Sequence, residues 1–249
     1  MTPSRADEAR LAFQLLTRLP VGRIGGEPPA MAASSWAWPL AGAGVGLISA
    51  LACGVGTLLG LPATMSALMA LAAGLLATGA MHEDGLADLA DGFGGGRNRE
   101  RKLEIMRDSR IGTYGVVALC IALGMRAVGI AALAGAGGAA MALIGIAAAS
   151  RAVLPMALIR MPAARDNGLG RMAAGDDPAP AWAAALIGFF CLLPLGLGTA
   201  LLVAFAMVLA ALILAGIAMR QIGGQTGDVL GAMQQVAEVA GWVALCALL

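Results

Sequence analysis

The sequence has few charged residues: Asp, Glu, Lys and Arg make up 12% of its 249 residues, where a soluble globular protein has about 25%. Such a composition argues against an ordinary soluble domain, whose surface carries many charged groups. The formal net charge is only +1, so nothing indicates a basic surface for nucleic acid, and we expect no nucleic-acid partner.

Histidine and paired cysteines are scarce as well. His82 is the only histidine, and the four cysteines lie in separate apolar runs without a CxxC pair: Cys53, Cys120, Cys191 and Cys246. Zinc sites and disulfides are indicated by cysteines at characteristic spacings. We therefore expect neither, and we interpret the cysteines as small buried apolar residues.

Apolar residues are abundant, at 59% of the chain. A helix needs about 20 of them to cross a bilayer. Seven runs are candidates, the fifth being short and containing Pro194: residues 36–61, 63–81, 113–134, 138–159, 181–197, 198–219 and 229–249. Gly and Ala dominate the runs, which permits close helix packing in lipid. We predict an all-α, polytopic membrane bundle of about seven transmembrane helices, forming one domain over residues 1–249.

Basic residues are distributed unevenly along this pattern. Fourteen of the 16 Lys and Arg residues precede the first run or lie in the connections after the second, fourth and sixth runs. The alternate turns, near Pro62, Ala136 and Gly198, have none. The positive-inside rule then places the N-terminus and the charged connections in the cytoplasm, with the C-terminus on the other side.

The N-terminal segment, residues 1–35, precedes the first run. Apolar residues recur at helical spacing over residues 6–19. Two interpretations are open: a helix lying in the membrane interface, or a short helix packed on the rest of the domain.

Carboxylates are concentrated just after the second run, in a stretch (residues 81–115) that holds 13 of the 31 formal charges. Asp84, Asp88 and Asp91 stand at i, i+4 and i+7, so a helix places all three on one face. No Lys or Arg lies between them to offset their repulsion, and oxygen ligands of this kind suit Mg²⁺ or Mn²⁺. We predict a metal site on this face.

The helix of the second run is expected to continue into the carboxylate face, because Gly85 alone does not break a helix. His82 would then point about 200° away from Asp84, and an interfacial or structural role for it is as open as a catalytic one. Glycines at 94–96, a basic run at 97–102 and Asp108-Ser109-Arg110 follow. Metal-binding carboxylates, flexible backbone and clustered arginines are the parts of a phosphoryl-transfer site. We therefore predict that residues 82–112 are the catalytic segment, and we interpret most basic residues of 98–107 as a solvated helix face.

Three further charged positions lie in or beside apolar runs. Arg126 and Arg151 are inside runs and must face the bundle interior. We expect Arg126 to pair with a carboxylate such as Glu238, whereas structural pairing and substrate phosphate are both open for Arg151. Asp228 either contributes to the site or caps the last helix, and we favour the site.

Two long strings carry a family resemblance: His82-Glu83-Asp84-Gly85-Leu86-Ala87-Asp88 with Asp91-Gly92, and Glu104-Ile105-Met106-Arg107-Asp108-Ser109-Arg110-Ile111-Gly112-Thr113. They resemble the cobalamin (5′-phosphate) synthase family, the adenosylcobinamide-GDP ribazoletransferases. The resemblance departs from the family pattern at Leu89, and it extends to Thr17-Arg18-Leu19-Pro20-Val21, Trp38-Pro39-Leu40 and Gly223-Gly224-Gln225-Thr226-Gly227-Asp228.

The resemblance implies a multi-pass enzyme of the bacterial inner membrane, dependent on Mg²⁺, with its active site facing the cytoplasm. Its substrates would be adenosylcobinamide-GDP and α-ribazole or its 5′-phosphate, and homo-oligomerisation stays open. Catalytic roles would fall to His82, Asp84, Asp88, Asp91, Asp108 and Arg110. Binding roles would fall to Arg107, Ser109, Gly224, Thr226 and Asp228, with the loop at 168–170 near the site. The metal would be held by Asp84, Asp88 and Asp91.

Three other functions share parts of this pattern. The CDP-alcohol phosphotransferases are membrane enzymes with spaced aspartates, but their Asp-Gly-x-x-Ala-Arg signature is absent here. A divalent-cation transporter would place carboxylates near mid-membrane on several spans. A purely structural membrane subunit would leave the row of like charges unexplained.

Overall fold

The computed structural model describes residues 4–135, 138–165 and 177–249, so the predicted site loop at 168–170 lies outside the described residues. Within these ranges all regular structure is helical, apart from one isolated parallel bridge between Ala163 and Gln225. The α-helices are α1 (Arg5–Leu16), α2 (Met31–Ser34), α3 (Trp38–Leu58), α4 (Ala63–Thr78), α5 (Met81–Gly95), α6 (Arg99–Ile105), α7 (Thr113–Ala134), α8 (Ala139–Ala152), α9 (Leu154–Arg160), α11 (Ala179–Leu192), α12 (Leu197–Ile222) and α13 (Gly227–Cys246).

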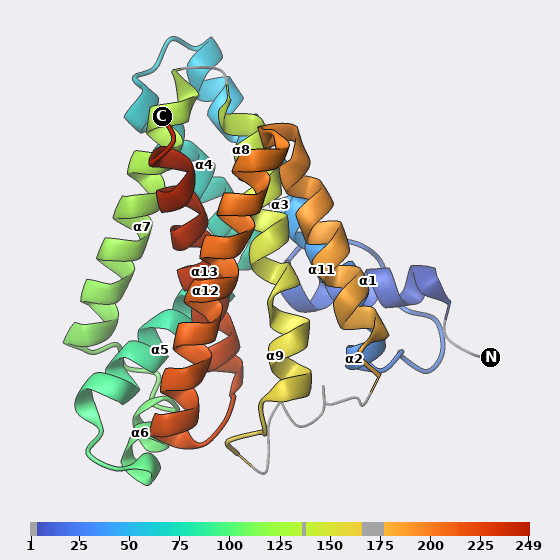
Figure 1. Cartoon of the computed structure of the whole chain (residues 1–249), viewed down its shortest axis with the longest axis vertical. Helices are drawn as coiled ribbons and strands as arrows, with labels where there is room; N and C mark the ends of the chain where they lie inside the picture. Colours follow the sequence, from blue (N-terminus) through green and yellow to red (C-terminus); the bar gives the residue numbers. More distant parts are fainter. Residues whose placement is uncertain (1–3, 136–137, 166–176) are drawn as a thin grey trace.

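Helices occupy all seven runs that the sequence predicts, and the all-α membrane bundle is confirmed (Figure 1). Two of the runs differ from a simple span. The segment Ala179–Leu195 is shorter than the others, and α4 and α5 form one span only if a 90° bend is included. Five described segments are by themselves long and apolar enough to cross a membrane: Met31–Leu58, Thr113–Ala134, Ala139–Arg160, Leu197–Ile222 and Gly227–Cys246.

Small residues allow the central helices to approach closely. A Cβ added to Gly42 would lie 2.3 Å from the carbonyl oxygen of Ala147, and one added to Gly46 would lie 2.5 Å from that of Leu143. Any side chain at these two positions of α3 would therefore push α8 away. Helices within lipid are not driven together by the hydrophobic effect. Close backbone contact stabilises their association through van der Waals packing instead.

The predicted continuation of the second span into the carboxylate face is wrong. α4 ends at Gly79, and Gly79 and Ala80 both adopt left-handed backbone conformations, with φ of 67° and 58°. Glycine takes this conformation without steric cost, but alanine does not. The chain therefore turns by 90° and α5 starts afresh at Met81. The sequence signal for this break was Gly79, a residue type that commonly ends helices.

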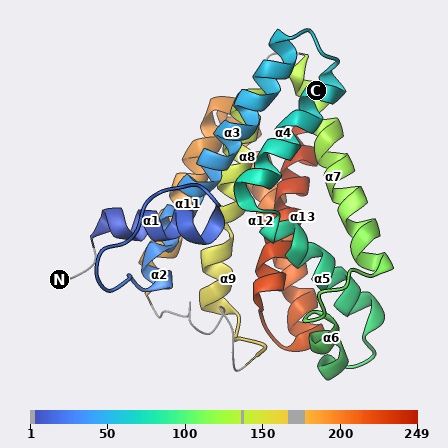
Figure 2. The ribbon, with the colours of Figure 1, turned by 180° about the vertical axis from the view of Figure 1, so that it is seen from behind.

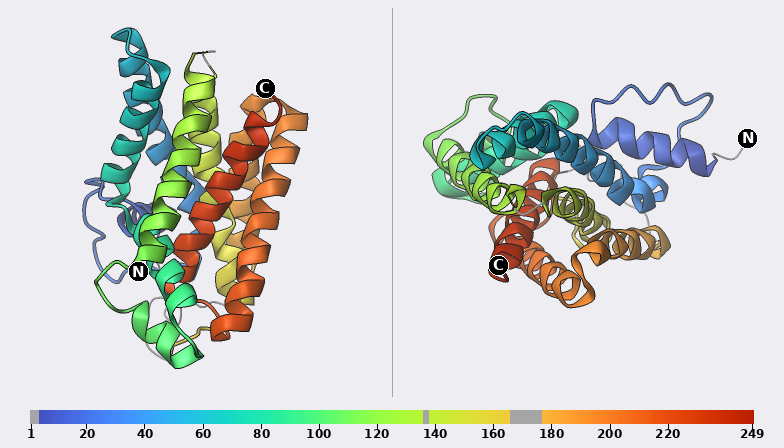
Figure 3. Two further views of the ribbon diagram at one scale, coloured as in Figure 1. Left: turned by 90° about the vertical axis from the view of Figure 1, so that its left-hand side faces the viewer. Right: turned by 90° about the horizontal axis from the view of Figure 1, so that it is seen from above.

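The N-terminal segment packs on the bundle, as the second interpretation of it expects. Ala12 and Leu16 of α1 are buried in the core, and the Trp36 Nε1–H donates a hydrogen bond to Glu8 at 2.7 Å. Arg18 covers the break after α4, where its backbone N–H donates to Ala77 O at 2.7 Å. Figure 3 shows α1 projecting beside the bundle.

The interpretation of the cysteines as buried is correct only for Cys53. Cys120 is exposed, and Cys191 and Cys246 are half-buried. The surrounding helices are apolar on their outer faces too, so a small apolar side chain is compatible with either side of them. All four thiols are free.

Charged and uncharged connections lie at opposite ends of the bundle. Figure 1 shows α6, the segment after α9 and the α12–α13 connection at one end, and the α3–α4 and α11–α12 turns with the C-terminus at the other. This separation is the one that the positive-inside rule requires. Which end faces the cytoplasm stays a prediction.

We predict that the α6 end is cytoplasmic. With the four native cysteines replaced, Cys substituted for the exposed Asn98 should react with a membrane-impermeant thiol reagent only after the cells are opened. Cys substituted for Leu59, which is 69% exposed at the α3–α4 turn, should react in intact cells. The reverse pattern would overturn this orientation.

Candidate functional site

The first part of the site is a group of carboxylates from two helices. Asp84 and Asp88 lie one turn apart on α5, and Asp228 lies in the first turn of α13. The negative charges of Asp84, Asp228 and Asp91 all act on Asp88. Gly85 permits this arrangement, because a Cβ there would lie 3.0 Å from the carbonyl oxygen of Asp228. The fold thus adds Asp228 to the predicted carboxylate face.

Asp91 has a structural task that the sequence analysis did not predict, and its role as a metal ligand stays a prediction. Its two carboxylate oxygens accept hydrogen bonds from the backbone N–H groups of Gly112 at 2.7 Å and Gly115 at 2.9 Å. Gly112 is the N-cap residue of α7 and has no capping side chain of its own, so Asp91 supplies the cap from another helix. The unpaired N–H groups and the positive end of the helix dipole both favour a carboxylate there. Asp91 anchors α5 to α7.

Asp228 does not cap its own helix. The N-cap of α13 is Thr226, whose hydroxyl accepts from the backbone N–H of Val229 at 3.3 Å and also lies 3.2 Å from the Asp228 carboxylate. The alternative role of Asp228 as the helix cap is therefore wrong. The placement of its carboxylate beside Asp84 and Asp88 agrees with the favoured role in the site.

Arginines adjoin the carboxylates on one side. Arg165 lies 3.5 Å from Asp228 and donates to Leu103 O at 3.2 Å, while the charge of Arg107 acts on both Asp228 and Arg165. Burial lowers the pKa of Arg165 from its ordinary value, and Asp228 opposes that shift; the guanidinium stays charged. An open cleft of about 550 Å³ lies beside these residues, between α6 and the segment 163–165. Three arginines line it together with two glutamates: Arg99, Arg107, Arg165, Glu100 and Glu104.

Arg165 is a candidate site residue that the sequence analysis did not single out. In the sequence, the one feature that pointed to Arg165 was its position in a polar connection, next to the loop that the resemblance assigns to the site. Its contact with Asp228 joins two connections far apart in the chain, and residue spacing carries no information on such a contact.

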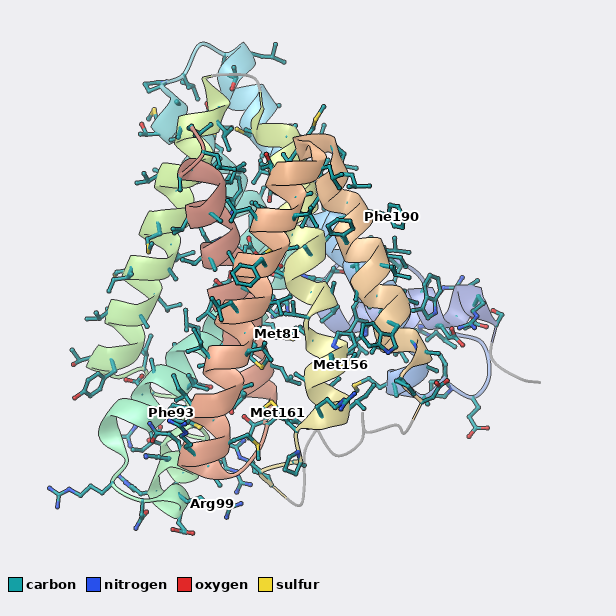
Figure 4. All side chains as sticks on the ribbon, viewed as in Figure 1. Met81, Phe93, Arg99, Met156, Met161 and Phe190 are labelled. Atoms are coloured by element: carbon teal, nitrogen blue, oxygen red, sulfur yellow. The ribbon has the colours of Figure 1, made fainter. Side chains whose placement is uncertain are left out.

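Arg99 is exposed on the predicted solvated face, but it also acts as a clamp between distant segments. Its guanidinium donates to Ile222 O at 2.9 Å and to Ala164 O at 2.8 Å, at the charged end of the molecule (Figure 4). The backbone N–H of Ala164 donates to Gln225 O, and that of Gln225 donates to Pro162 O, each at 2.8 Å. Arg99 thereby holds together the two connections that carry Arg165 and Asp228.

Gly224 and Thr226 build this end of the site. A Cβ on Gly224 would lie 2.1 Å from Pro162 O, so only glycine permits the two connections to pair there, and Thr226 caps α13. Both residues thus have local structural roles, and their contact with a ligand stays a prediction.

The loop before α7 does not bring its side chains to the carboxylates of α5. Asp108 and Arg110 bond to each other, with 2.7 Å between Arg110 Nη2 and Asp108 Oδ2. The hydrogen bonds from Arg110 lower the pKa of Asp108 to about 2. Arg110 is 87% exposed, and Ser109 is exposed as well. Of the predicted residues in this loop, Arg107 is the one whose charge acts on Asp228.

His82 is buried, with 3% of its surface exposed, and its Nε2 atom has no hydrogen-bond partner among the described residues. It packs against Gly231, where an added Cβ would lie 3.3 Å from His82 Cα. His82 was predicted to point away from the carboxylates. It nevertheless borders the same cavity as Asp84 and Asp228, because that cavity extends along the α5–α13 contact.

A buried ionic cluster lies deeper in the bundle. Arg126 of α7 contacts Glu238 at 2.7 Å and Glu83 at 3.1 Å, which confirms the expected pairing. Gln235 donates to Glu83 at 2.9 Å. Arg151 lies 3.9 Å from Glu238 and donates to Ala147 O at 2.9 Å, so the structure supports structural pairing for Arg151.

The carboxylates fit a hard divalent cation by their chemistry. In the described ranges no group of three or more His, Cys, Asp or Glu side chains is close enough to hold a metal ion by itself. Mg²⁺ does not require such a group, because it is usually held by one or two carboxylates, waters and substrate phosphates. Asp84, Asp88 and Asp228 offer oxygen donors beside an arginine-lined cleft. Asp91 is the poorest donor of the predicted set, since both its oxygens already accept hydrogen bonds.

Comparison with known proteins covers almost the whole chain. The family model described as cobalamin-5-phosphate synthase matches residues 8–246. The chain is 49% identical to the adenosylcobinamide-GDP ribazoletransferase of Bradyrhizobium diazoefficiens, over 93% of this chain and 90% of that protein. It is 44% identical to that of Mesorhizobium japonicum (94% and 90%) and 43% identical to that of Azorhizobium caulinodans (92% and 91%). No solved structure gives a significant match.

The capping role of Asp91 predicts a loss of stability when its charge is removed. In Asp91→Asn, one side-chain oxygen is replaced by an NH₂ group, which cannot accept from a backbone N–H. The free energy of unfolding should fall by about 1–3 kcal/mol, measured as a lower Tm in detergent with EDTA. Asp88→Asn is the matched control, because it removes a charge that its neighbours repel. A Tm for Asp91→Asn equal to that of Asp88→Asn would refute the cap.

Proposed function

Because the chain belongs to the cobalamin-5-phosphate synthase family, we propose that it transfers the cobinamide-phosphate moiety of adenosylcobinamide-GDP to α-ribazole or α-ribazole 5′-phosphate. The products are GMP and adenosylcobalamin or its 5′-phosphate, at a late step of cobalamin biosynthesis. The relatives' names support this reaction. The site supports it independently through one observation: carboxylates of α5 and α13 adjoin an arginine-lined cleft.

Transfer requires a nucleoside hydroxyl to attack the cobinamide-proximal phosphorus while the bond to GMP breaks. Negative charge then develops on the leaving phosphate, and fixed positive groups stabilise it. Arg107 and Arg165 are placed to do so at the edge of the cleft. The charges of both arginines act on the carboxylate of Asp228. The attacking and leaving groups would therefore come together between these arginines and Asp228.

We propose that Mg²⁺ is held by Asp84, Asp88 and Asp228, with Mn²⁺ as a substitute. Asp91, which the sequence analysis placed in the ligand set, supports the other ligands by fixing α5. A bound Mg²⁺ would neutralise part of the diphosphate charge. Without a cation, the carboxylates would repel the diphosphate. A bound divalent cation would offset this repulsion.

The attacking hydroxyl must lose its proton to a base within hydrogen-bond reach. Two kinds of base border the cavity between α5 and α13: the carboxylates of Asp84 and Asp228, and His82, whose Nε2 is unpartnered in the described structure. Of these groups, Asp228 lies 3.5 Å from Arg165. A hydroxyl held by its carboxylate would therefore lie beside the arginines that we expect to bind the phosphate.

A divalent-cation transporter is not favoured. It would need charged carboxylates available near mid-membrane. The interior carboxylates Glu83 and Glu238 are neutralised by two arginines, Arg126 and Arg151. We propose instead that the site faces the cytoplasm from the bacterial inner membrane, where charged nucleotides are available.

Removing one carboxylate from the site should reduce turnover strongly. We expect Asp88→Asn and Asp228→Asn each to slow GMP release from adenosylcobinamide-GDP and α-ribazole by about 10²–10³-fold, the size of effect seen when one group stabilising the transition state is lost. EDTA should abolish GMP release by the wild-type protein, and Mg²⁺ should restore it. Asn keeps the shape of the side chain, and Thr226 rather than Asp228 caps α13, so folding should be unaffected.

Glu27→Gln serves as the control, since Glu27 is exposed in the N-terminal connection. It removes one negative charge away from α5 and should leave the rate unchanged. Wild-type turnover in Asp88→Asn would refute the metal site proposed here.

A further inference from the structure

A second, more enclosed cavity lies on the side of the carboxylates away from the arginine cleft. Its volume is about 230 Å³. We call it the α1–α9 pocket. Its walls are mostly apolar, and His82, Asp84 and Asp228 border it from α5 and α13; the apolar side chains that line it include Leu15, Leu16, Met31, Trp38, Leu154 and Leu158. Figure 2 shows α9 between α1 and the α5–α13 pair in projection.

Two polar atoms of residues that border this pocket have no partner. Trp38 Nε1 and His82 Nε2 make no hydrogen bond within the described structure, although Trp38 is only 4% exposed and His82 only 3%. Both atoms are enclosed by protein and do not face the cavity itself, so the charged residues that border it are Asp84 and Asp228. A mostly apolar pocket with a few polar groups is the usual form of a small-molecule site.

We propose that the α1–α9 pocket binds the planar, largely apolar base of the nucleoside substrate. This inference rests on the proposed function. With the base against Leu154 and Leu158, the ribose lies toward Asp84 and Asp228, where its hydroxyl meets the reacting phosphorus. The pocket thus orients the attacking group and selects among nucleosides by the size of their base.

Size excludes the other substrate from this pocket. Clefts that take drug-sized ligands measure roughly 300–1,000 Å³, so about 230 Å³ suits one bicyclic ring. A corrinoid macrocycle is far larger. Its nucleotide is also anionic, and the α1–α9 pocket is bordered by two carboxylates and, among the described residues, no arginine, whereas three arginines and two glutamates line the open cleft.

The N-terminal segment acquires a function in this assignment. Leu15 and Leu16 close the α1–α9 pocket from α1, and Met31 does so from α2. Leu15 and Leu16 precede the first candidate span, and Met31 begins it. They act here as walls that determine which base fits.

Leu158→Phe tests the pocket by filling it. We expect KM for α-ribazole to rise at least about tenfold, because a hydrophobic pocket discriminates by about 10–200-fold for one methylene group. KM for adenosylcobinamide-GDP should stay unchanged. Leu158→Ala should enlarge the pocket and shift kcat/KM toward nucleosides with a larger base, when benzimidazole, dimethylbenzimidazole and naphthimidazole ribosides are compared.

Met156→Phe is the matched control on the same helix. Met156 lies two residues from both Leu154 and Leu158 and lines a different cavity, between α9, α11 and α12 (Figure 4). The same increase in volume there should leave both KM values and the preference among bases unchanged.

The failure of this assignment is distinguishable from failure of the proposed function. Absence of GMP release by the wild-type protein with every nucleoside would overturn both. Normal turnover with equal rises of both KM values in Leu158→Phe, or an unaltered base preference in Leu158→Ala, would overturn the pocket alone. So would loss of a copurifying lipid in Leu158→Phe without a change in nucleoside KM, since the occupant would then be a lipid chain.

Discussion

The ion pairs of Arg126 with Glu83 and Glu238 are the interaction on which the rest of the structure depends. They join α5, α7 and α13 inside an apolar bundle. A charge buried there is stable only when it is paired and hydrogen-bonded, and removing one partner of such a pair costs about 3–5 kcal/mol. Glu83 lies in the first turn of α5. This pairing therefore fixes where α5 begins and helps to hold the 90° break that follows α4.

The position of α5 in turn assembles the site. From its fixed start the helix packs along α13, where the absence of a side chain at Gly85 lets Asp228 approach. At its other end Asp91 caps α7. Between these two anchors, Asp84 and Asp88 face the end of the bundle without an internal positive partner on α5. Structural pairing at both ends thus holds two like charges together, where repulsion alone would separate them.

The carboxylates also separate two volumes of opposite character. On one side is an open cleft lined by arginines, and on the other a smaller, mostly apolar pocket. A reaction that joins an anionic nucleotide derivative to a nucleoside with an apolar base needs this division, because neither substrate suits the other's environment. Arg99 stabilises the division by holding the connections after α9 and α12 together.

The sequence by itself determined the helices, the family and the carboxylate spacing, because these depend on residues near one another in the chain. Only the tertiary structure decided what each charged residue does. An aspartate is equally suited to binding a metal or capping a helix, and the partner distinguishes Asp91, bound to Gly112 and Gly115, from Asp88. The contact of Arg165 with Asp228 joins connections far apart in sequence. Local spacing predicts which groups share a helix face, whereas the partner of a buried or polar group is set by packing between distant segments.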